Sequence, residues 1–299
     1  MNSSACADRA SMTVSGASMT IHNSAPWLEA AFLGVLQGLT EFLPVSSSAH
    51  LRIAGALLPS GTDPGAAFTA ITQIGTEAAV LLYFRRDIWR IALAWLTALT
   101  KRPATLSPDA RLGWLIILGT LPIAILGLAF KHQIEGGLRN LYITATMLIG
   151  FGLVLGLADR IGVRRLPLET LGWRHGVLLG FAQALALIPG VSRSGGTISA
   201  ALLLGFTREA AARYSFLLAI PAVLASGVFE LLDSYDKPNP IGGGPTLLAT
   251  VLAFGVGYAV IVGFLRLLQS RSFLPFVLYR IAAGTAVLLL LANGMIAAR

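Results

Sequence analysis

Charged side chains are scarce in this sequence. Asp, Glu, Lys and Arg together make up 12% of the 299 residues, whereas hydrophobic residues make up 55%. An ordinary soluble domain carries about 25% charged and roughly 45–50% apolar residues. The shortage of charge excludes an ordinary soluble globular domain, and the excess of apolar residues predicts an integral membrane protein.

Cysteine is almost missing as well. Cys6 is the single cysteine, which excludes a disulfide within the chain and a metal site built from cysteines. The first 26 residues are polar, rich in Ser, Ala and Thr, and without the apolar run that a secretory signal peptide needs. We expect residues 1–26 to form a disordered tail ahead of a single membrane domain at residues 27–297.

Long apolar runs are what the sequence does contain. A run near 18 residues or longer can cross a hydrocarbon core of roughly 30 Å as a helix. Two further apolar stretches, 27–58 and 176–206, are interrupted in the middle by Pro, Ser and Gly and carry strongly polar residues. We therefore predict an all-α integral membrane protein with about six transmembrane helices and two re-entrant helix–loop–helix segments. The spans are predicted at 66–84, 112–130, 141–158, 214–232, 247–265 and 276–297.

The net charge of +8 comes from basic residues that are unevenly distributed. Many of them fall in segments 85–111 and 159–175, whereas segments 131–140 and 233–246 carry few. Because basic loops remain in the cytoplasm, we assign loops 85–111, 159–175 and 266–275 to that side. Membrane topology therefore accounts for the charge, and nucleic acid is not expected as a partner.

Two segments of the chain resemble each other. LGVLQGLTEFLPVSSS (33–48) and LGFAQALALIPGVSRS (179–194) share Gly, Gln and Leu at matching places, followed by a proline and serines. We therefore predict a duplication, with a first repeat at about 27–158 and a second at about 176–297. Three spans separate the two interrupted stretches, and an odd number inverts the second repeat. The broken segments then enter from opposite leaflets, and their tips meet near the midplane.

The first interrupted stretch carries a group of polar residues. Glu41 follows Gln37 by one helical turn and lies on the same helix face. A carboxylate inside the membrane is costly, so it indicates a functional site. Serines that start a helix are ordinarily caps, and a lone buried histidine is ordinarily satisfied by its neighbours, but here a break at Pro44 could fold them beside the carboxylate. The candidate residues of this tip are Gln37, Glu41, Ser46, Ser47, Ser48 and His50.

The second interrupted stretch supplies groups that suit an anion. In PGVSRSGGT, residues 189–197, Arg193 stands among hydroxyls and glycines that let the backbone approach a ligand closely. A guanidinium beside N–H and hydroxyl donors matches the oxygens of a phosphate. Together the tips predict phosphoryl transfer on a lipid-linked phosphate; the alternative is an inverted-repeat transporter or lipid flippase for a polyprenyl phosphate. The substrate-binding candidates of this tip are Gly190, Ser192, Ser194 and Thr197, and Ser46 and Ser48 are those of the first tip.

Two motifs carry a family resemblance. TEFLPVSSSAH and LIPGVSRSGGT closely resemble the signature motifs of the undecaprenyl-diphosphate phosphatases, the bacitracin-resistance family that recycles the lipid carrier of cell-wall synthesis. The resemblance covers about residues 27–297, and TQIGTEAAVLLYFRRD and FVLYRIAAG also look like segments of that family. It implies hydrolysis of undecaprenyl diphosphate to the monophosphate and inorganic phosphate. It also implies a multi-pass protein of the bacterial inner membrane, with a site open to the periplasm and a divalent cation, Mg²⁺ or Ca²⁺.

The resemblance also implies roles by motif position. Glu41 would be the essential acid, His50 the catalytic histidine, Ser47 the candidate nucleophile, with water as the alternative, and Arg193 the diphosphate ligand. The metal is expected on Glu41, with Gln37 as a second candidate ligand. Because a glutamine carries no negative charge, a metal site made of two carboxylates is in doubt.

Glu77 and Arg52 have no role in this scheme. Glu77 falls within a predicted span, and Arg52 follows soon after the candidate histidine. Either the two side chains pair with each other, or they reach water at the mouth of a cavity. The expected partners are a polyprenyl diphosphate and membrane lipids, and a homodimer is left open.

Overall fold

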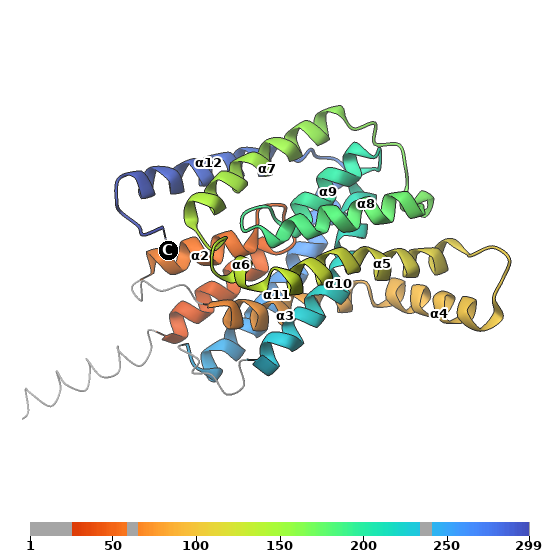
Figure 1. Cartoon of the computed structure of the whole chain (residues 1–299), viewed down its shortest axis with the longest axis horizontal. Helices are drawn as coiled ribbons and strands as arrows, with labels where there is room; N and C mark the ends of the chain where they lie inside the picture. The colour runs from red at the N-terminus through yellow and green to blue at the C-terminus, as the bar shows by residue number, and fades with distance from the viewer. Residues whose placement is uncertain (1–25, 59–64, 234–240, 299) are drawn as a thin grey trace, which may run out of the picture.

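The computed structural model describes residues 26–58, 65–233 and 241–298. Over these ranges the chain is helical, and β-type pairing within them is limited to an isolated bridge between Leu166 and Phe206. Figure 1 shows the helices packed side by side, many of them running in the same general direction. The all-α prediction is confirmed. The predicted tail falls outside the described ranges except for its last residue.

Long apolar helices form the membrane-spanning part of the fold. In the described ranges, five helices have the length and hydropathy of a span, and α3 together with α4 makes a sixth that is bent by 76°. These helices lie where the sequence predicts the six spans, so that prediction is confirmed. They are α3 (Gly65–Tyr83), α5 (Pro108–Ala129), α7 (Leu141–Ile161), α10 (Arg208–Asp233), α11 (Gly243–Leu268) and α12 (Leu274–Ala292).

The segment after α3 differs from the prediction. The sequence predicts a basic loop over 85–111, but Arg85–Lys101 form helix α4. Its charged residues lower its mean hydropathy, although its apolar residues recur at helical spacing. Trp95 on α4 packs against Gly113 and lies edge-on to Trp114 of α5, with ring centroids 5.5 Å apart. The basic residues here therefore lie largely on a helix that pairs with α5. The other connections hold the short helices α6 (Lys131–Glu135) and η1 (Leu168–Thr170).

Each interrupted stretch forms two helices joined by a break, at the place that the sequence predicts. In both breaks a serine with positive φ precedes the second helix: Ser46 has φ 72° and Ser192 has φ 75°. Such a φ is uncommon for any residue other than glycine, so the two hairpins share an unusual turn. The first hairpin consists of a helix at residues 26–40 and α2 (Ser47–Leu57), and the second of α8 (Trp173–Ala184), η2 (Leu185–Leu187) and α9 (Arg193–Leu203).

A matched pair of glycines packs the two hairpins in the same way. A Cβ atom on Gly34 would lie 2.4 Å from the backbone oxygen of Ala249 on α11, and one on Gly180 would lie 2.7 Å from that of Gly119 on α5. Only glycine allows the backbones to approach this closely. Equivalent positions of the two halves thus make equivalent helix contacts, as an inverted repeat requires. The exact boundaries of the repeats stay a prediction.

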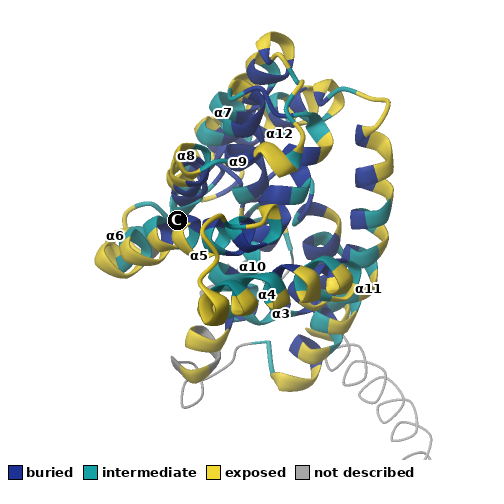
Figure 2. Cartoon of the chain, turned by 90° about the vertical axis from the view of Figure 1, so that its right-hand side faces the viewer, coloured by how far each residue is buried: buried dark blue, intermediate teal, exposed yellow. Residues whose placement is uncertain are grey.

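Buried residues concentrate where the hairpins meet the spans. Figure 2 shows them on α9 and on the inward faces of its neighbours, whereas the outward faces of α4, α5 and α6 are largely exposed. Many exposed side chains are large and apolar, among them Leu96, Ile125 and Leu128. An apolar surface of this extent is expected where acyl chains cover the protein. The outward faces of these helices are therefore the part of the molecule that is expected to face lipid.

Candidate active site

The tips of the two hairpins meet. Glu41 follows the first helix, where its N–H donates to the carbonyl oxygen of Gln37 at 3.0 Å, and Arg193 is the first residue of α9. The Arg193 guanidinium donates to a carboxylate oxygen of Glu41. A second link joins the tips, because Ser194 Oγ donates to the carbonyl oxygen of Leu43 at 3.1 Å. Glu41 and Arg193, which the topology predicts on opposite tips, are thus in direct contact.

Glu41 is the centre of a hydrogen-bonded group. Its Oε2 accepts from Gln37 Nε2 at 2.7 Å and from Ser47 Oγ at 2.5 Å, and its Oε1 accepts from Arg193. The Glu41 side chain is only 7% exposed. A buried carboxylate is tolerated when hydrogen bonds and an opposite charge replace the water that it has lost. The arrangement also places Glu41 where it can accept the hydroxyl proton of Ser47.

Ser47 and Arg193 occupy matching positions in the two hairpins. Each is the first residue of a helix of 11 residues, α2 or α9. The serines on either side of Ser47 have their Oγ atoms 3.4 Å apart, and those on either side of Arg193 have theirs 3.1 Å apart. The free backbone N–H groups at a helix N-terminus attract anions. The hydroxyl and the guanidinium therefore stand at two sites that are each suited to a phosphate oxygen.

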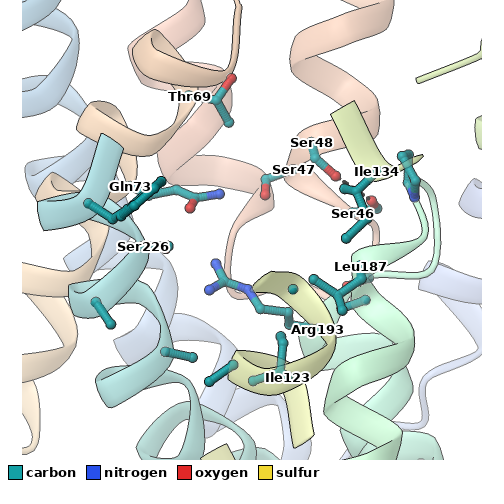
Figure 3. Close-up of a pocket in the computed structure, with 18 of the residues that line it drawn as sticks. Ser46, Ser47, Ser48, Thr69, Gln73, Ile123, Ile134, Leu187, Arg193 and Ser226 are labelled. Atoms are coloured by element: carbon teal, nitrogen blue, oxygen red, sulfur yellow. Dashed lines mark hydrogen bonds between the residues drawn. The ribbon is translucent and has the colours of Figure 1, made fainter. Parts of the chain in front are cut away.

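A cavity of about 580 Å³ adjoins these groups. Figure 3 shows Ser47 and Arg193 at its edge, on different elements and separated by open space. Small and apolar side chains of α5 and α10 make up much of its walls, so the cavity offers both polar and apolar surface. The basic side chains Arg52, Lys131 and Arg139 also line it. Wall residues include Ile123, Ala124, Gly127, Ala222, Ala225 and Phe229.

Three predicted substrate-binding residues lie behind this surface. Among the described residues, Gly190, Ser194 and Thr197 are not part of the cavity lining, whereas Ser46, Ser48 and Ser192 are. Thr197 is buried on α9, and Ser194 bonds the opposite tip. Gly190 has φ 96°, and its ideal Cβ would lie 2.3 Å from the backbone oxygen of Thr144. These three residues shape the tip, and their contact with substrate stays a prediction.

His50 bonds to residues outside the Glu41 cluster. It is buried, and in the described part of the chain it is not among the lining residues. Its Nδ1 lies 2.7 Å from the carbonyl oxygen of Ser46, and its Nε2 lies 2.7 Å from the hydroxyl of Tyr279 on α12. The fold thus brings Glu41, Ser47 and Arg193 together, whereas the ring nitrogens of His50 are engaged elsewhere. Its predicted role as a catalytic group stays a prediction.

Glu77 is a buried carboxylate next to the same cluster. It comes from α3, is 2% exposed, and lines a small second cavity together with Glu41 and Arg193. The sequence left open whether Glu77 and Arg52 pair with each other or line a cavity, and the structure places them at different cavities. Glu77 lies by Arg193, whereas Arg52 lines the main cavity and donates to the carbonyl oxygen of Ala298 at 3.4 Å. Within the described ranges, Glu77 Oε1 has no hydrogen-bond partner.

Some oxygen atoms near Glu41 are candidate ligands for the expected cation. Gln37 Oε1, like Glu77 Oε1, is buried without a hydrogen-bond partner in the part of the chain that the structure describes. Carboxylate and amide oxygens are the ligands that Mg²⁺ and Ca²⁺ prefer. No group of three or more His, Cys, Asp or Glu side chains that could hold a metal occurs among the described residues. The two unpartnered oxygens are of the type that a hard cation binds, and such a cation would need further ligands from substrate and water. The cation stays a prediction.

Arg280 belongs to the site although no role was predicted for it, and it lies in the segment FVLYRIAAG. It is fully buried on α12 and donates to the carbonyl oxygens of Pro44 at 2.8 Å and Gly190 at 2.7 Å, which are matching positions of the two tips. It also donates to the carbonyl oxygen of Leu148 on α7 at 3.0 Å. Arg280 thereby holds both tips against the spanning helices. Its position inside the predicted span 276–297 was the available signal, because an ionisable residue within a span indicates a functional site.

Comparison with known proteins agrees with this geometry. The family described as bacitracin resistance protein BacA matches residues 30–286. A relative from Agrobacterium fabrum strain C58, named undecaprenyl-diphosphatase 2, is 67% identical over 91% of this chain and 98% of its own length. Relatives from Arthrobacter sp. strain FB24 and Micrococcus luteus, both named undecaprenyl-diphosphatase, are each 60% identical over 91% of this chain and over 96% and 99% of their own lengths. The chain therefore belongs to the bacitracin resistance protein BacA family.

Proposed function

We propose that this membrane protein hydrolyses undecaprenyl diphosphate to undecaprenyl phosphate and inorganic phosphate, and so returns the lipid carrier to peptidoglycan synthesis. The observation that carries the proposal is the contact of Glu41 with both Ser47 and Arg193 beside a cavity with apolar walls. The names of the relatives support the same substrate. The proposed loss of the terminal phosphate from the lipid diphosphate is consistent with the bacitracin resistance after which the family is described.

Arg193 binds the diphosphate in this scheme. Its planar guanidinium can form two parallel hydrogen bonds with phosphate oxygens, and the N-terminus of α9 adds backbone donors. The guanidinium side chain is 19% exposed and lines the cavity, so a ligand can reach it. Most catalysis of phosphoryl transfer comes from neutralising the phosphate oxygens in this way.

Ser47 attacks the terminal phosphorus. Its hydroxyl proton passes to Glu41 as the bond from Oγ to phosphorus forms, and the bond from phosphorus to the bridging oxygen breaks. Undecaprenyl phosphate leaves. Water then hydrolyses the phosphoserine, which releases inorganic phosphate and restores the hydroxyl. In the alternative form of the step, water held by Ser47 and Glu41 attacks directly and the same bond breaks.

A divalent cation completes the proposed site. Gln37, Glu77 and Glu41 would hold Mg²⁺ or Ca²⁺ through their side-chain oxygens, and the cation would neutralise charge on the diphosphate. We expect chelation with EDTA to abolish phosphate release, and Mg²⁺ or Ca²⁺ to restore it. Full turnover in the presence of EDTA, measured as inorganic phosphate released in detergent, would remove the cation from the scheme.

The hydrocarbon tail lies along the apolar walls of the cavity. Gly127 on α5 and Ala225 on α10 belong to walls of small residues that leave room for an isoprenoid chain. Lys131 and Arg139, from the segment that the charge distribution places outside the cytoplasm, also line the cavity. This supports a cavity that opens to the periplasmic side of the inner membrane.

Phosphate release from purified protein tests the function against its rival. A transporter or flippase with the same inverted hairpins would release no phosphate from undecaprenyl diphosphate in detergent. We expect the wild-type protein to release it, and Glu41→Gln to lower the rate about 10²–10⁴-fold because the group that accepts the serine proton is gone. An intact lipid after incubation of folded wild-type protein with Mg²⁺ or Ca²⁺ would contradict the proposal.

A further inference from the structure

The hydrogen bonds of His50 fix how its ring is used. A carbonyl oxygen only accepts, so the Nδ1 that faces the Ser46 carbonyl at 2.7 Å carries a hydrogen. In the neutral ring, Nε2 then accepts from the Tyr279 hydroxyl at 2.7 Å. The two rings also stack, with centroids 5.5 Å apart and planes 11° apart. Both nitrogens are therefore occupied, and neither bonds to Glu41, Ser47 or Arg193 in the described structure.

The residue that His50 holds is in a strained conformation. Ser46 has φ 72° and ψ 93°, a backbone geometry that costs energy in a residue with a side chain and persists only when its surroundings impose it. Ser46 immediately precedes Ser47. The direction of its peptide unit therefore sets where the Ser47 hydroxyl points, and here that hydroxyl lies 2.5 Å from Glu41.

The second hairpin has the same positive-φ turn, but different hydrogen bonds are made there. Ser192, at the matching position, has φ 75° and caps α9 with its own hydroxyl, which accepts from the N–H of Gly195 at 3.1 Å. In the described structure Ser46 makes no such side-chain cap on α2. The position that matches His50 in the second hairpin is Gly196. The turn of the first hairpin is thus bonded by an imidazole at the carbonyl oxygen of its positive-φ serine, whereas the turn of the second is bonded through the hydroxyl of its serine.

We propose that His50 and Tyr279 are positioning residues that hold the Ser46 turn so that Ser47 presents its hydroxyl to Glu41. In this role His50 carries no proton to or from the substrate. The inference deepens the proposed function and rests on it, because it concerns the presentation of the same hydroxyl. It applies equally when that hydroxyl orients an attacking water.

Replacing His50 by asparagine distinguishes a positioning role of His50 from a role in proton transfer. His50→Asn places an amide nitrogen where Nδ1 stands and can donate to Ser46, but it has no group that titrates. We expect His50→Ala to lower kcat by about 10²-fold through misplacement of the hydroxyl, with KM nearly unchanged, and His50→Asn to recover most of that loss. His50→Asn as inactive as His50→Ala, with both proteins folded, would overturn the proposal.

A change at the strained residue itself gives an independent test. Glycine tolerates positive φ, so Ser46→Gly should raise the kcat of His50→Ala by relieving the need for the imidazole. The matched control is Arg102→Gly in the same background, which relieves the same kind of backbone strain at an exposed position outside the site, φ 44°, and should give no rescue. A proton relay predicts no rescue by either change, so a double variant Ser46→Gly/His50→Ala no more active than His50→Ala counts against positioning.

Tyr279→Phe tests the second member of the pair. It keeps the stacked ring and removes the hydroxyl, so we expect kcat to fall severalfold with unchanged KM. Tyr142→Phe on α7 is the control, because its exposure, 46%, is close to the 47% of Tyr279. Wild-type kcat in Tyr279→Phe would remove Tyr279 from the proposal. Absence of turnover in the wild-type protein would instead contradict the proposed function, so the two failures are distinct.

Discussion

At the scale of single residues, the site depends on one buried ion pair. Glu41 and Arg193 come from different hairpins, and each compensates the charge of the other at a position with little exposure. The same pair prepares the chemistry, because the carboxylate bonds Ser47 while the guanidinium lines the cavity. In the proposed reaction, a substrate phosphate that binds Arg193 would compete with Glu41 for the guanidinium. Under that proposal, binding of the substrate would free Glu41 from the ion pair and so allow it to accept the Ser47 proton.

Arg193→Lys tests the geometry of the guanidinium. An ammonium keeps the charge but cannot form two parallel hydrogen bonds, so we expect kcat to fall about 10²–10³-fold. Phosphate release in detergent measures the loss. Arg271→Lys, at an exposed position between α11 and α12, is the control and should leave turnover unchanged. Near-normal turnover in Arg193→Lys would exclude a bidentate clamp.

At the scale of elements, close helix contacts hold the hairpins in place. The first helix of each hairpin contacts a spanning helix through a glycine. Gly34 packs against α11, and Gly180 packs against α5. Arg280 then ties the two tips to each other through their carbonyl oxygens. A break in a helix leaves backbone groups without partners, and inside a membrane they must be satisfied by the protein. The buried arginine supplies part of what the two breaks lack.

Gly34→Ala tests this packing. The added Cβ would lie 2.4 Å from the backbone oxygen of Ala249, so the helices must separate. We expect the free energy of unfolding to drop by about 1–3 kcal/mol, seen as a lower melting temperature in detergent. Gly255→Ala on α11 is the matched control, because its Cβ would have no neighbour within 4 Å in the described structure. Equal melting of the two variants would contradict the close contact.

The elements were predictable from the sequence to different degrees. Long apolar runs and paired Pro–Ser interruptions reflect local requirements of a helix in lipid, so the spans and both breaks lie where the sequence predicts them. Helix α4 was missed because Arg85, Arg86 and Arg90 interrupt its apolar residues. Amphipathic helices of this kind require a search for helical periodicity in addition to one for mean hydropathy.

At the scale of the whole molecule, the inverted arrangement gives the cavity its direction. The segment that contains α6 contributes Lys131 and Arg139 to the lining, whereas the basic segments assigned to the cytoplasm lie at the other ends of the spans. A lipid whose head group lies at the membrane surface can then reach the tips from one side. The proposed function therefore predicts that the substrate enters from the leaflet on the side of α6.

Cysteine labelling tests this orientation. With Cys6→Ser as background, His132→Cys on α6 should react with a membrane-impermeant maleimide in intact cells. Arg271→Cys, between α11 and α12, should react only after the cells are permeabilised. Both residues are exposed, so accessibility should depend on the side of the membrane alone. The reverse labelling pattern would contradict a cavity open to the periplasm.

The sequence by itself determined the membrane class, the spans, the two breaks and the residues that stand at them, because hydropathy and helix interruption are properties of neighbouring residues. Only the tertiary structure decided which of those residues face the cavity. It turned His50 toward Tyr279, placed Glu77 beside Arg193, and brought Arg280 to both tips. Each of these contacts joins residues far apart in the chain, and no local pattern specifies which side chain lies opposite another once the helices have packed.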